Sequence, residues 1–406
     1  MAEFHPFKGI RYNSNKVNLT DVIAPPYDVV NAEDRKRLCE KSPYNAIRIE
    51  LPDKTLPPEI DPYTQAAEEF FFWRKNEIIV RDDLPSFYIY RMTFAADSQV
   101  AKSSTTGIIG ALGLDANAKD VLPHEQTMPK PKGDRLDLLR TAETNTSPIW
   151  TLSLAEGLAK FCRTITDNDS PVSSAKDEDG ILHELWVVND KARVDTIRDL
   201  VSSTPLIIAD GHHRYETALH YQAERRQATQ TTGSHPYDCL MAFVVELTDE
   251  ELVVNAIHRL VAGLPADFNA ISAFSADFDL TPAPESPTNL ERQLVSQDSL
   301  GLITKAGNYF LKPHADLLQK DSTGLDSARL DLALERFPAH HLTYQHGAMN
   351  IDREIENGNA QLGILLRPAT VSQIADTAHS FKRMPPKTTF FHPKPRTGLV
   401  FRSLED

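Results

Sequence analysis

Four polar side chains surround a single glycine in residues 209–215, ADGHHRY. An apolar run, residues 206–209, precedes them, and a helical pattern from Tyr215 to about Gln230 follows. We therefore expect a strand that turns at Gly211 into a helix, whose first turn favours a bound anion because of the helix dipole. Glycine at the turn lets the backbone approach a ligand closely. This junction predicts a binding site for a phosphate-like group.

The side chains next to the glycine suit phosphoryl transfer. His212, His213 and Arg214 add hydrogen-bond donors, and a guanidinium can hold a phosphate through two bonds at once. Asp210 places a carboxylate at the end of the strand, where it could hold Mg²⁺ or orient a hydroxyl. An N-cap aspartate followed by surface histidines is the simpler alternative. The two adjacent histidines diverge and lack a third ligand at helical spacing, which argues against a zinc site.

A second polar cluster lies upstream, where prolines at positions 123, 129 and 131 hold the chain extended. Glu125 is a candidate general base, and Lys132 or Arg135 a candidate phosphate contact. A solvated charged loop is the alternative interpretation. The cluster comprises His124, Glu125, Thr127, Lys130, Lys132, Asp134 and Arg135.

A third cluster, residues 384–398, combines positive charge with hydroxyl donors and suits a phosphorylated ligand. A basic segment that merely ends the fold is equally compatible with it. The sequence contains no GxxxxGK[ST], no GxGxxG after a strand and no GxSxG, so P-loop, Rossmann and hydrolase sites are unsupported. The candidate residues of the third cluster are Lys387, Thr388, Thr389 and Lys394.

Strands that alternate with helices predict a mixed α/β (α+β) fold around these clusters. Periodicity and turn residues predict an exposed loop at residues 167–180 and an irregular, proline-rich segment over 263–300, which is either a linker or a variable surface segment. The predicted strands are 87–95, 106–114, 182–189, 206–209, 237–247, 360–366 and 388–391, and the predicted helices are 63–79, 134–143, 190–203, 215–230 and 371–381.

Composition and net charge limit the classes of molecule that the protein is expected to bind. Lys and Arg number 43 against 57 Asp and Glu, and the resulting net charge of −14 argues against nonspecific nucleic-acid binding. The three cysteines form no CxxC pair, which is typical of reduced thiols. The N-terminus lacks an apolar signal segment and no run is long enough to span a bilayer. We expect a cytoplasmic protein with small-molecule substrates, no nucleic-acid partner and no membrane partner, and leave a homodimer open.

Several blocks in order along the whole chain resemble the family called domain of unknown function 1015. ADGHHRY is the most specific of them, and its DGHHR turn also resembles the signature of the ParB/sulfiredoxin fold, which includes kinases of free serine. In the last block this chain has Lys387-Thr388-Thr389 where Lys-Ser-Thr is expected. The blocks are APPYDVV at 24–30, LPHEQT at 122–127, DRLDLL at 134–139, SPI at 147–149, ADGHHRYETA at 209–218, HRLV at 258–261 and MPPKTTFFHPK at 384–394.

The resemblance implies a ParB/sulfiredoxin-like core with a mixed sheet over residues 111–262, an N-terminal α/β segment at 1–110 and a C-terminal α/β segment at 263–406 that completes the site. It implies a kinase of free L-serine that yields O-phosphoserine, takes phosphate from pyrophosphate, ADP or ATP, and requires Mg²⁺. Glu125, Asp210 and His213 are then the expected catalytic residues, with Asp210 on the metal. The expected contacts to phosphate or substrate are Gly211, His212, Arg214, Tyr215, His124, Thr127, Arg135, Lys387, Thr388 and Lys394.

Two other functions remain open from the sequence. One is a ParB-like nucleotide-binding regulatory protein, which the acidic charge disfavours. The other is a phosphatase that transfers the phosphoryl group of a small metabolite to water.

Overall fold

The computed structural model describes residues 2–95, 102–117, 119–123, 133–230, 233–248, 250–380 and 383–405. The chain forms two compact units. Unit 1 joins residues up to Pro123, residues Pro129–Leu252 and the C-terminal segment Pro393–Asp406, and the described residues of unit 2 are 253–380 and 383–392. The segment boundaries predicted at residues 110 and 262 stay predictions.

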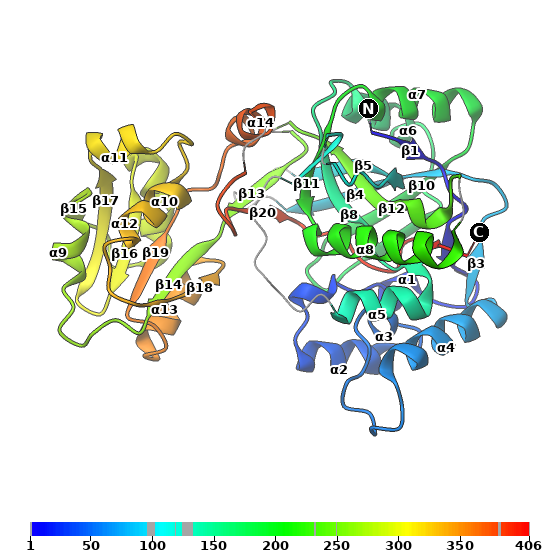
Figure 1. The fold of residues 1–406 in the computed structure, drawn as a ribbon, viewed down its shortest axis with the longest axis horizontal. Helices are drawn as coiled ribbons and strands as arrows, with labels where there is room; N and C mark the ends of the chain where they lie inside the picture. Colours follow the sequence, from blue (N-terminus) through cyan, green and yellow to red (C-terminus); the bar gives the residue numbers. More distant parts are fainter. Residues whose placement is uncertain are drawn as a thin grey trace. The chain divides into compact units, whose positions relative to one another are not determined.

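Unit 1 is built on a mixed sheet of nine strands (Figure 1). Two of its pairings, β6 with β11 and β8 with β12, are parallel, and the others are antiparallel. Strand β1 pairs with β5 beside the main path. In sheet order the strands are β6 (Val121–Pro123), β11 (Leu206–Asp210), β8 (Ile149–Ser153), β12 (Cys239–Glu246), β5 (Lys102–Gly113), β4 (Phe87–Ala95), β10 (Leu182–Val188) and β9 (Ser173–Lys176), with β1 (Phe4–His5) at the side.

Helices and short strand pairs surround this sheet. The pairs are β2 (Ile10–Tyr12) with β3 (Ile79–Arg81), and β7 (Thr144–Asn145) with β21 (Arg402–Ser403). The helices of unit 1 are α1 (Leu19–Val22), α2 (Ala32–Lys41), α3 (Ile47–Glu50), α4 (Pro62–Lys75), α5 (Gly133–Ala142), α6 (Leu158–Thr166), α7 (Lys191–Ser202) and α8 (His212–Thr229), with 3-10 turns at Tyr27–Val29 and Pro236–Asp238.

The two faces of the sheet are covered differently. Side chains alternate along a strand, so Phe87 and Ile89 lie on one face and Tyr88 and Tyr90 on the other. The first pair belongs to the core cluster that also holds residues of α6, α7 and α8. On the second face, Tyr88 Oη accepts a hydrogen bond from the Gly9 backbone N–H and Tyr90 Oη one from that of Arg396. Segments from both ends of the chain therefore close the second face.

The C-terminal segment crosses unit 1 through backbone pairing. Thr397 bridges to Ala24, Phe401 bridges to Ile10, and Arg402 in β21 pairs with Asn145 in β7. These pairings place Lys394 beside Asp28, which lies 366 positions earlier in the sequence.

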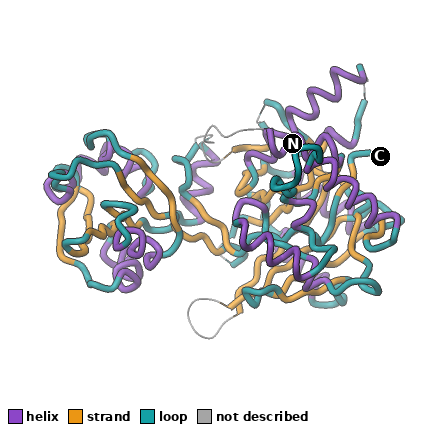
Figure 2. The backbone as a smooth tube through the Cα atoms, turned by 90° about the horizontal axis from the view of Figure 1, so that it is seen from below, coloured by secondary structure: helices purple, strands orange, loops and turns teal. Residues whose placement is uncertain are grey.

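Unit 2 contains an antiparallel sheet of six strands with helices packed on it (Figure 2). A two-stranded pair, β13 (Val253–Ala256) with β20 (Thr389–His392), belongs to the same unit. The six strands in order are β15 (Phe278–Pro282), β17 (Gly307–Pro313), β16 (Leu300–Thr304), β19 (Leu362–Leu365), β14 (His258–Ala262) and β18 (His341–Gln345), and the helices are α9 (Ala270–Phe274), α10 (Pro287–Gln297), α11 (Ala315–Lys320), α12 (Asp326–Leu334), α13 (Ala348–Glu356) and α14 (Val371–His379).

The predicted mixed α/β class is confirmed, and most predicted elements agree within a few residues. The predicted irregular segment over residues 263–300 is wrong, because the segment forms α9, β15 and α10. Its apolar side chains Phe274, Phe278 and Leu294 are buried. The many prolines of the segment obscure the apolar periodicity by which these elements could have been predicted. The predicted loop at 167–180 contains β9.

No helix in the described ranges has both the length and the apolar character of a membrane span.

Candidate active site

The predicted glycine bend joins the end of β11 to the start of α8. Asp210 is the last strand residue, and Gly211 has a φ of +95°. A Cβ atom at Gly211 would lie 2.8 Å from Ile149 Cγ2 and 3.1 Å from Arg214 Nε. Both the left-handed backbone and this close approach require glycine. Helix α8 begins at His212, three residues earlier than predicted, so His212, His213 and Arg214 form its first turn.

Two cationic side chains hold the Asp210 carboxylate. Arg214 Nη2 lies 2.7 Å from Oδ2, and Lys394 Nζ lies 3.0 Å from Oδ1. Lys394 also contacts Asp28 Oδ2 at 2.6 Å. Burial by itself would raise the pKa of Asp210, but Lys394 and Arg214 outweigh it and hold that pKa well below its usual value. Burial likewise opposes the charge on Lys394, yet Asp210 and Asp28 raise the pKa of its ammonium group.

Arg214 connects the bend to a second acidic residue. Its Nη1 donates to Ser147 Oγ at 3.0 Å and to the Pro148 carbonyl at 2.6 Å. Ser147 in turn donates to Glu50 Oε1 at 2.9 Å. Arg135 approaches the same oxygen at 3.9 Å and donates to the Glu50 backbone carbonyl at 2.7 Å. The glycine bend, through Arg214, and the second polar cluster, through Arg135, therefore both connect to Glu50.

Glu50 is the least satisfied acid of this network. It ends α3 with only 1 % of its surface exposed. Its Oε1 accepts from Ser147, whereas its buried Oε2 has no hydrogen-bond partner among the described residues. A buried carboxylate oxygen without a partner costs free energy, and a ligand that donates a hydrogen bond to it would recover that cost.

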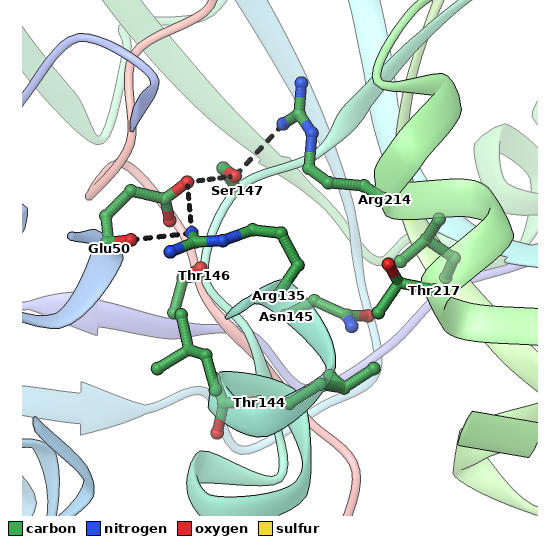
Figure 3. Close-up of a pocket in the computed structure, with 11 residues that line it drawn as sticks. Glu50, Arg135, Thr144, Asn145, Thr146, Ser147, Arg214 and Thr217 are labelled. Carbon is green, nitrogen blue, oxygen red and sulfur yellow. Dashed lines mark hydrogen bonds and ion pairs between the residues drawn. The ribbon is translucent and has the colours of Figure 1, made fainter. Parts of the chain in front are cut away.

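Glu50 faces a small cavity within unit 1 (Figure 3). The space amounts to about 50 Å³, enough for roughly three or four water molecules. In Figure 3 the side chains of Glu50, Ser147 and Arg214 lie close together and are joined by dashed contacts. The lining residues are Glu50, Arg135, Leu138, Leu139, Thr144, Asn145, Thr146, Ser147, Arg214, Thr217 and Leu240.

The structure gathers part of the predicted site in unit 1. Asp210, Arg214 and Lys394 are in direct contact, and Arg135 joins them through Glu50 and Ser147. His212 and His213 are partly buried in the first helical turn. The hydroxyl of Tyr215 bonds to the backbone of Asp115, and its ring packs in the core.

The other predicted residues are not placed in this network. His124, Glu125, Thr127, Lys130 and Lys132 lie outside the described residues. Lys387, Thr388 and Thr389 belong to unit 2, where Thr388 Oγ1 bonds to Ser327 Oγ at 2.9 Å and to the Pro385 carbonyl at 2.8 Å. Their predicted roles stay predictions.

The predicted metal ligand, Asp210, already has a cationic partner on each oxygen. In the described part of the chain, no three His, Cys, Asp or Glu side chains group as metal ligands. These residues therefore do not form a resident metal site as they stand. Mg²⁺ stays a prediction for this protein, and phosphate oxygens of a donor commonly supply much of its coordination.

The sequence analysis missed Glu50 and did not assign Ser147 a role. Glu50 lies in the run IRIELP, where a single acid among apolar residues is a weak signal of burial. Ser147 belongs to the SPI block, and Asp28 to the APPYDVV block, so both could have been found through these blocks. The positions of Glu50 and Arg214 in the sequence do not predict that both residues line the same cavity.

A protein-family model described as "Protein of unknown function (DUF1015)" matches residues 4–333. The chain belongs to this family. Its predicted membership of the DUF1015 family is thereby confirmed, and the family description names no activity. No curated protein matches the sequence.

Several solved structures are similar to this DUF1015 member. A conserved hypothetical protein from Pyrococcus furiosus has 13 % identity and a TM-score of 0.37 over 71 % of this chain and 93 % of that one. A free serine kinase in complex with AMP has 12 % identity and a TM-score of 0.36 over 75 % and 95 %. C-terminally truncated SbnI from Staphylococcus aureus has 10 % identity and a TM-score of 0.39 over 72 % and 85 %. Likeness at this level says nothing of the activity of this chain.

Proposed function

We propose that this protein is a phosphotransferase that moves a phosphoryl group from pyrophosphate, or from ADP or ATP, to the hydroxyl of free L-serine and so forms O-phosphoserine. The buried Glu50 carboxylate carries the proposal, because one of its oxygens has no partner among the described residues and the residue lines a cavity whose wall it shares with Arg214. An acid that can accept a proton thus lies beside a glycine bend suited to anions.

Glu50 is the proposed general base. Its Oε2 would accept the proton of the serine hydroxyl while the hydroxyl oxygen forms a bond to the phosphorus of the donor. The bond from that phosphorus to the leaving phosphate oxygen breaks, and its electron pair stays with the leaving group. Glu125 was the base predicted from the sequence, and it remains the alternative because it lies outside the described residues.

Arg214, Lys394 and the start of α8 are the proposed contacts of the transferred phosphate. Phosphoryl transfer needs alignment and positive charge on the moving group more than covalent help. Arg214 is already held by Ser147 and the Pro148 carbonyl, so its guanidinium needs little reorganisation when the donor binds. Mg²⁺, if it accompanies the donor, would supply further charge neutralisation on the phosphate oxygens.

The small cavity favours a small acceptor. A space of about 50 Å³ is far too small for a peptide or a nucleic acid, and it would have to widen to hold the seven heavy atoms of L-serine. Pyrophosphate needs neither a base slot nor a ribose contact, which is consistent with the absence of a nucleotide motif in the sequence.

The test is a product assay with the full chain. Purified protein is incubated with L-serine, Mg²⁺ and either pyrophosphate, ADP or ATP, and phosphoserine is measured by mass spectrometry. We expect phosphoserine with at least one donor and about 10²- to 10³-fold less with Arg214→Ala. No phosphoserine with any donor contradicts the proposal, and release of phosphate from O-phosphoserine alone would indicate the phosphatase instead.

A further inference from the structure

Arg402 is a buried cation without an acidic partner. It lies in β21 with 5 % of its surface exposed. Its guanidinium donates to Asn145 Oδ1 at 3.1 Å, to the Cys239 carbonyl at 2.9 Å and to the Pro236 carbonyl at 2.7 Å. All three acceptors are neutral, and within the described ranges no Asp or Glu pairs with it. Burial lowers the pKa of Arg402 to about 10.

Most buried guanidinium groups have a carboxylate or phosphate beside them, because an uncompensated charge is costly to remove from water. The positive field of Arg402 therefore favours an anion close to it. Asn145 lies between Arg402 and the cavity. It lines the cavity, and its Oδ1 accepts a hydrogen bond from Arg402 Nη1.

The amide of Asn145 is oriented by its neighbours. Its Oδ1 accepts from Arg402 Nη1 and also from the Met241 backbone N–H at 3.0 Å. Both partners are donors, so the oxygen must face them and the NH₂ group must face elsewhere. Asn145 is only 4 % exposed and lines the cavity. Asn145 thus presents a polarised donor on the cavity wall.

Asn145 and Glu50 occupy different parts of that wall. In the view of Figure 3, the Arg135 side chain lies between them. The reacting hydroxyl belongs near Glu50 and Arg214, so the remaining groups of the acceptor extend along the cavity. An ammonium group is disfavoured beside Asn145, because only a donor faces it there and a cation lies behind.

We propose that Asn145, backed by Arg402, binds the carboxylate of the amino-acid acceptor and so selects acceptors that carry one. This inference rests on the proposed function for the identity of the acceptor as an amino acid. The juxtaposition of a fixed amide donor and a buried guanidinium is independent of that identity.

The sharpest test is Asn145→Asp. The new carboxylate keeps an acceptor for the Met241 N–H and pairs with Arg402, so the fold should be as stable as the wild type or more stable. It also repels a carboxylate ligand. We expect the affinity for L-serine, measured by calorimetry without a donor, to fall about 10- to 100-fold. Binding of L-serinamide, whose carboxylate is replaced by a neutral amide, should not weaken.

Asn15→Asp is the matched control, since it makes the same charge change on the exposed surface. It should leave both affinities unchanged. Arg402→Met is a second variant that removes the cation and should weaken L-serine far more than L-serinamide, whereas Arg402→Lys should restore part of the difference. Thermal unfolding of each variant verifies the fold.

Unchanged L-serine affinity in Asn145→Asp overturns the inference, as does an equal loss for L-serine and L-serinamide. A chain that binds L-serine through Asn145 but makes no phosphoserine would overturn the proposed function and leave this inference standing. Equal phosphoserine formation by the wild type and Asn145→Asp would support the proposed function and overturn this inference.

Discussion

Two charged pockets, one in each unit, differ in how completely their charges are paired. The pocket of unit 2 has a volume of about 430 Å³ and includes Asp326, Arg329 and Arg367. Asp326 accepts from Arg367 Nη2 at 2.6 Å, from its Nε at 2.9 Å and from its backbone N–H at 3.0 Å. Arg329 adds a contact at 3.4 Å and pairs with Asp321 at 2.9 Å.

The cavity of unit 1 is smaller, yet two charged groups in or beside it lack full partners among the described residues. Glu50 keeps a buried oxygen without a partner in the described chain, and the neighbouring Arg402 has only neutral acceptors. The larger pocket therefore has the features of a structural ion-pair network, and the smaller one those of a site prepared for a ligand. Unsatisfied buried charge, rather than the number of charges or the volume, separates the two.

The largest expected effect is that of Glu50→Gln. The amide keeps the shape of the side chain but cannot accept the hydroxyl proton, so turnover should fall about 10²- to 10⁴-fold. Stability should stay the same or rise, because a buried carboxylate oxygen without a partner is replaced by part of a neutral amide. Phosphoserine formation and urea denaturation measure the two quantities.

Glu125→Gln is the matched control for this prediction. Normal turnover in Glu50→Gln together with a large loss in Glu125→Gln would assign the base to Glu125 and remove the functional distinction between the two pockets.

Asp326→Ala should have the opposite profile. It leaves Arg367 partly buried without its main partner, so the free energy of unfolding should fall by about 3–5 kcal/mol. The three tryptophans, Trp73, Trp150 and Trp186, all lie in unit 1, so far-UV circular dichroism rather than tryptophan fluorescence must follow this loss. An unchanged unfolding transition would show that the ion pairs of unit 2 do not stabilise it.

The smallest expected effect concerns Asp134 in the helix that lines the unit 1 cavity. Burial alone would raise its pKa, but contacts with Lys54, Arg135 and Tyr63 lower it to about 2. A pKa below the unfolded value means that the charged carboxylate stabilises the fold above pH 4 and that this contribution is lost as the pH falls toward 2. Asp134→Asn should thus be less stable than the wild type at pH 7.

The difference in unfolding free energy between Asp134→Asn and the wild type should shrink between pH 4 and pH 2. Urea denaturation at a series of pH values measures it. A difference that stays constant over this range would mean that the charge of Asp134 is not the stabilising feature.

Local pattern was enough to predict much of the fold. The aromatic alternation of FYIYRMTFA predicts β4 with its observed bounds, and the spacing in residues 134–143 predicts α5 to within one residue. The sequence predicts the start of α8 three residues late, because His212 and His213 are weaker helix formers than the residues that follow them. Helix α8 begins directly after the glycine, whose left-handed backbone ends the strand.

The sequence alone determined the glycine bend, its neighbouring acid and guanidinium, the mixed α/β class and membership of the DUF1015 family. Only the tertiary structure decided that Lys394 reaches Asp210, that Glu50 is buried beside Ser147, and that Arg402 lies behind Asn145. The physical reason is the distance along the chain over which each interaction acts. Turn and helix preferences act within a few residues, whereas the partners of a buried charge are chosen by strand pairings that join residues hundreds of positions apart.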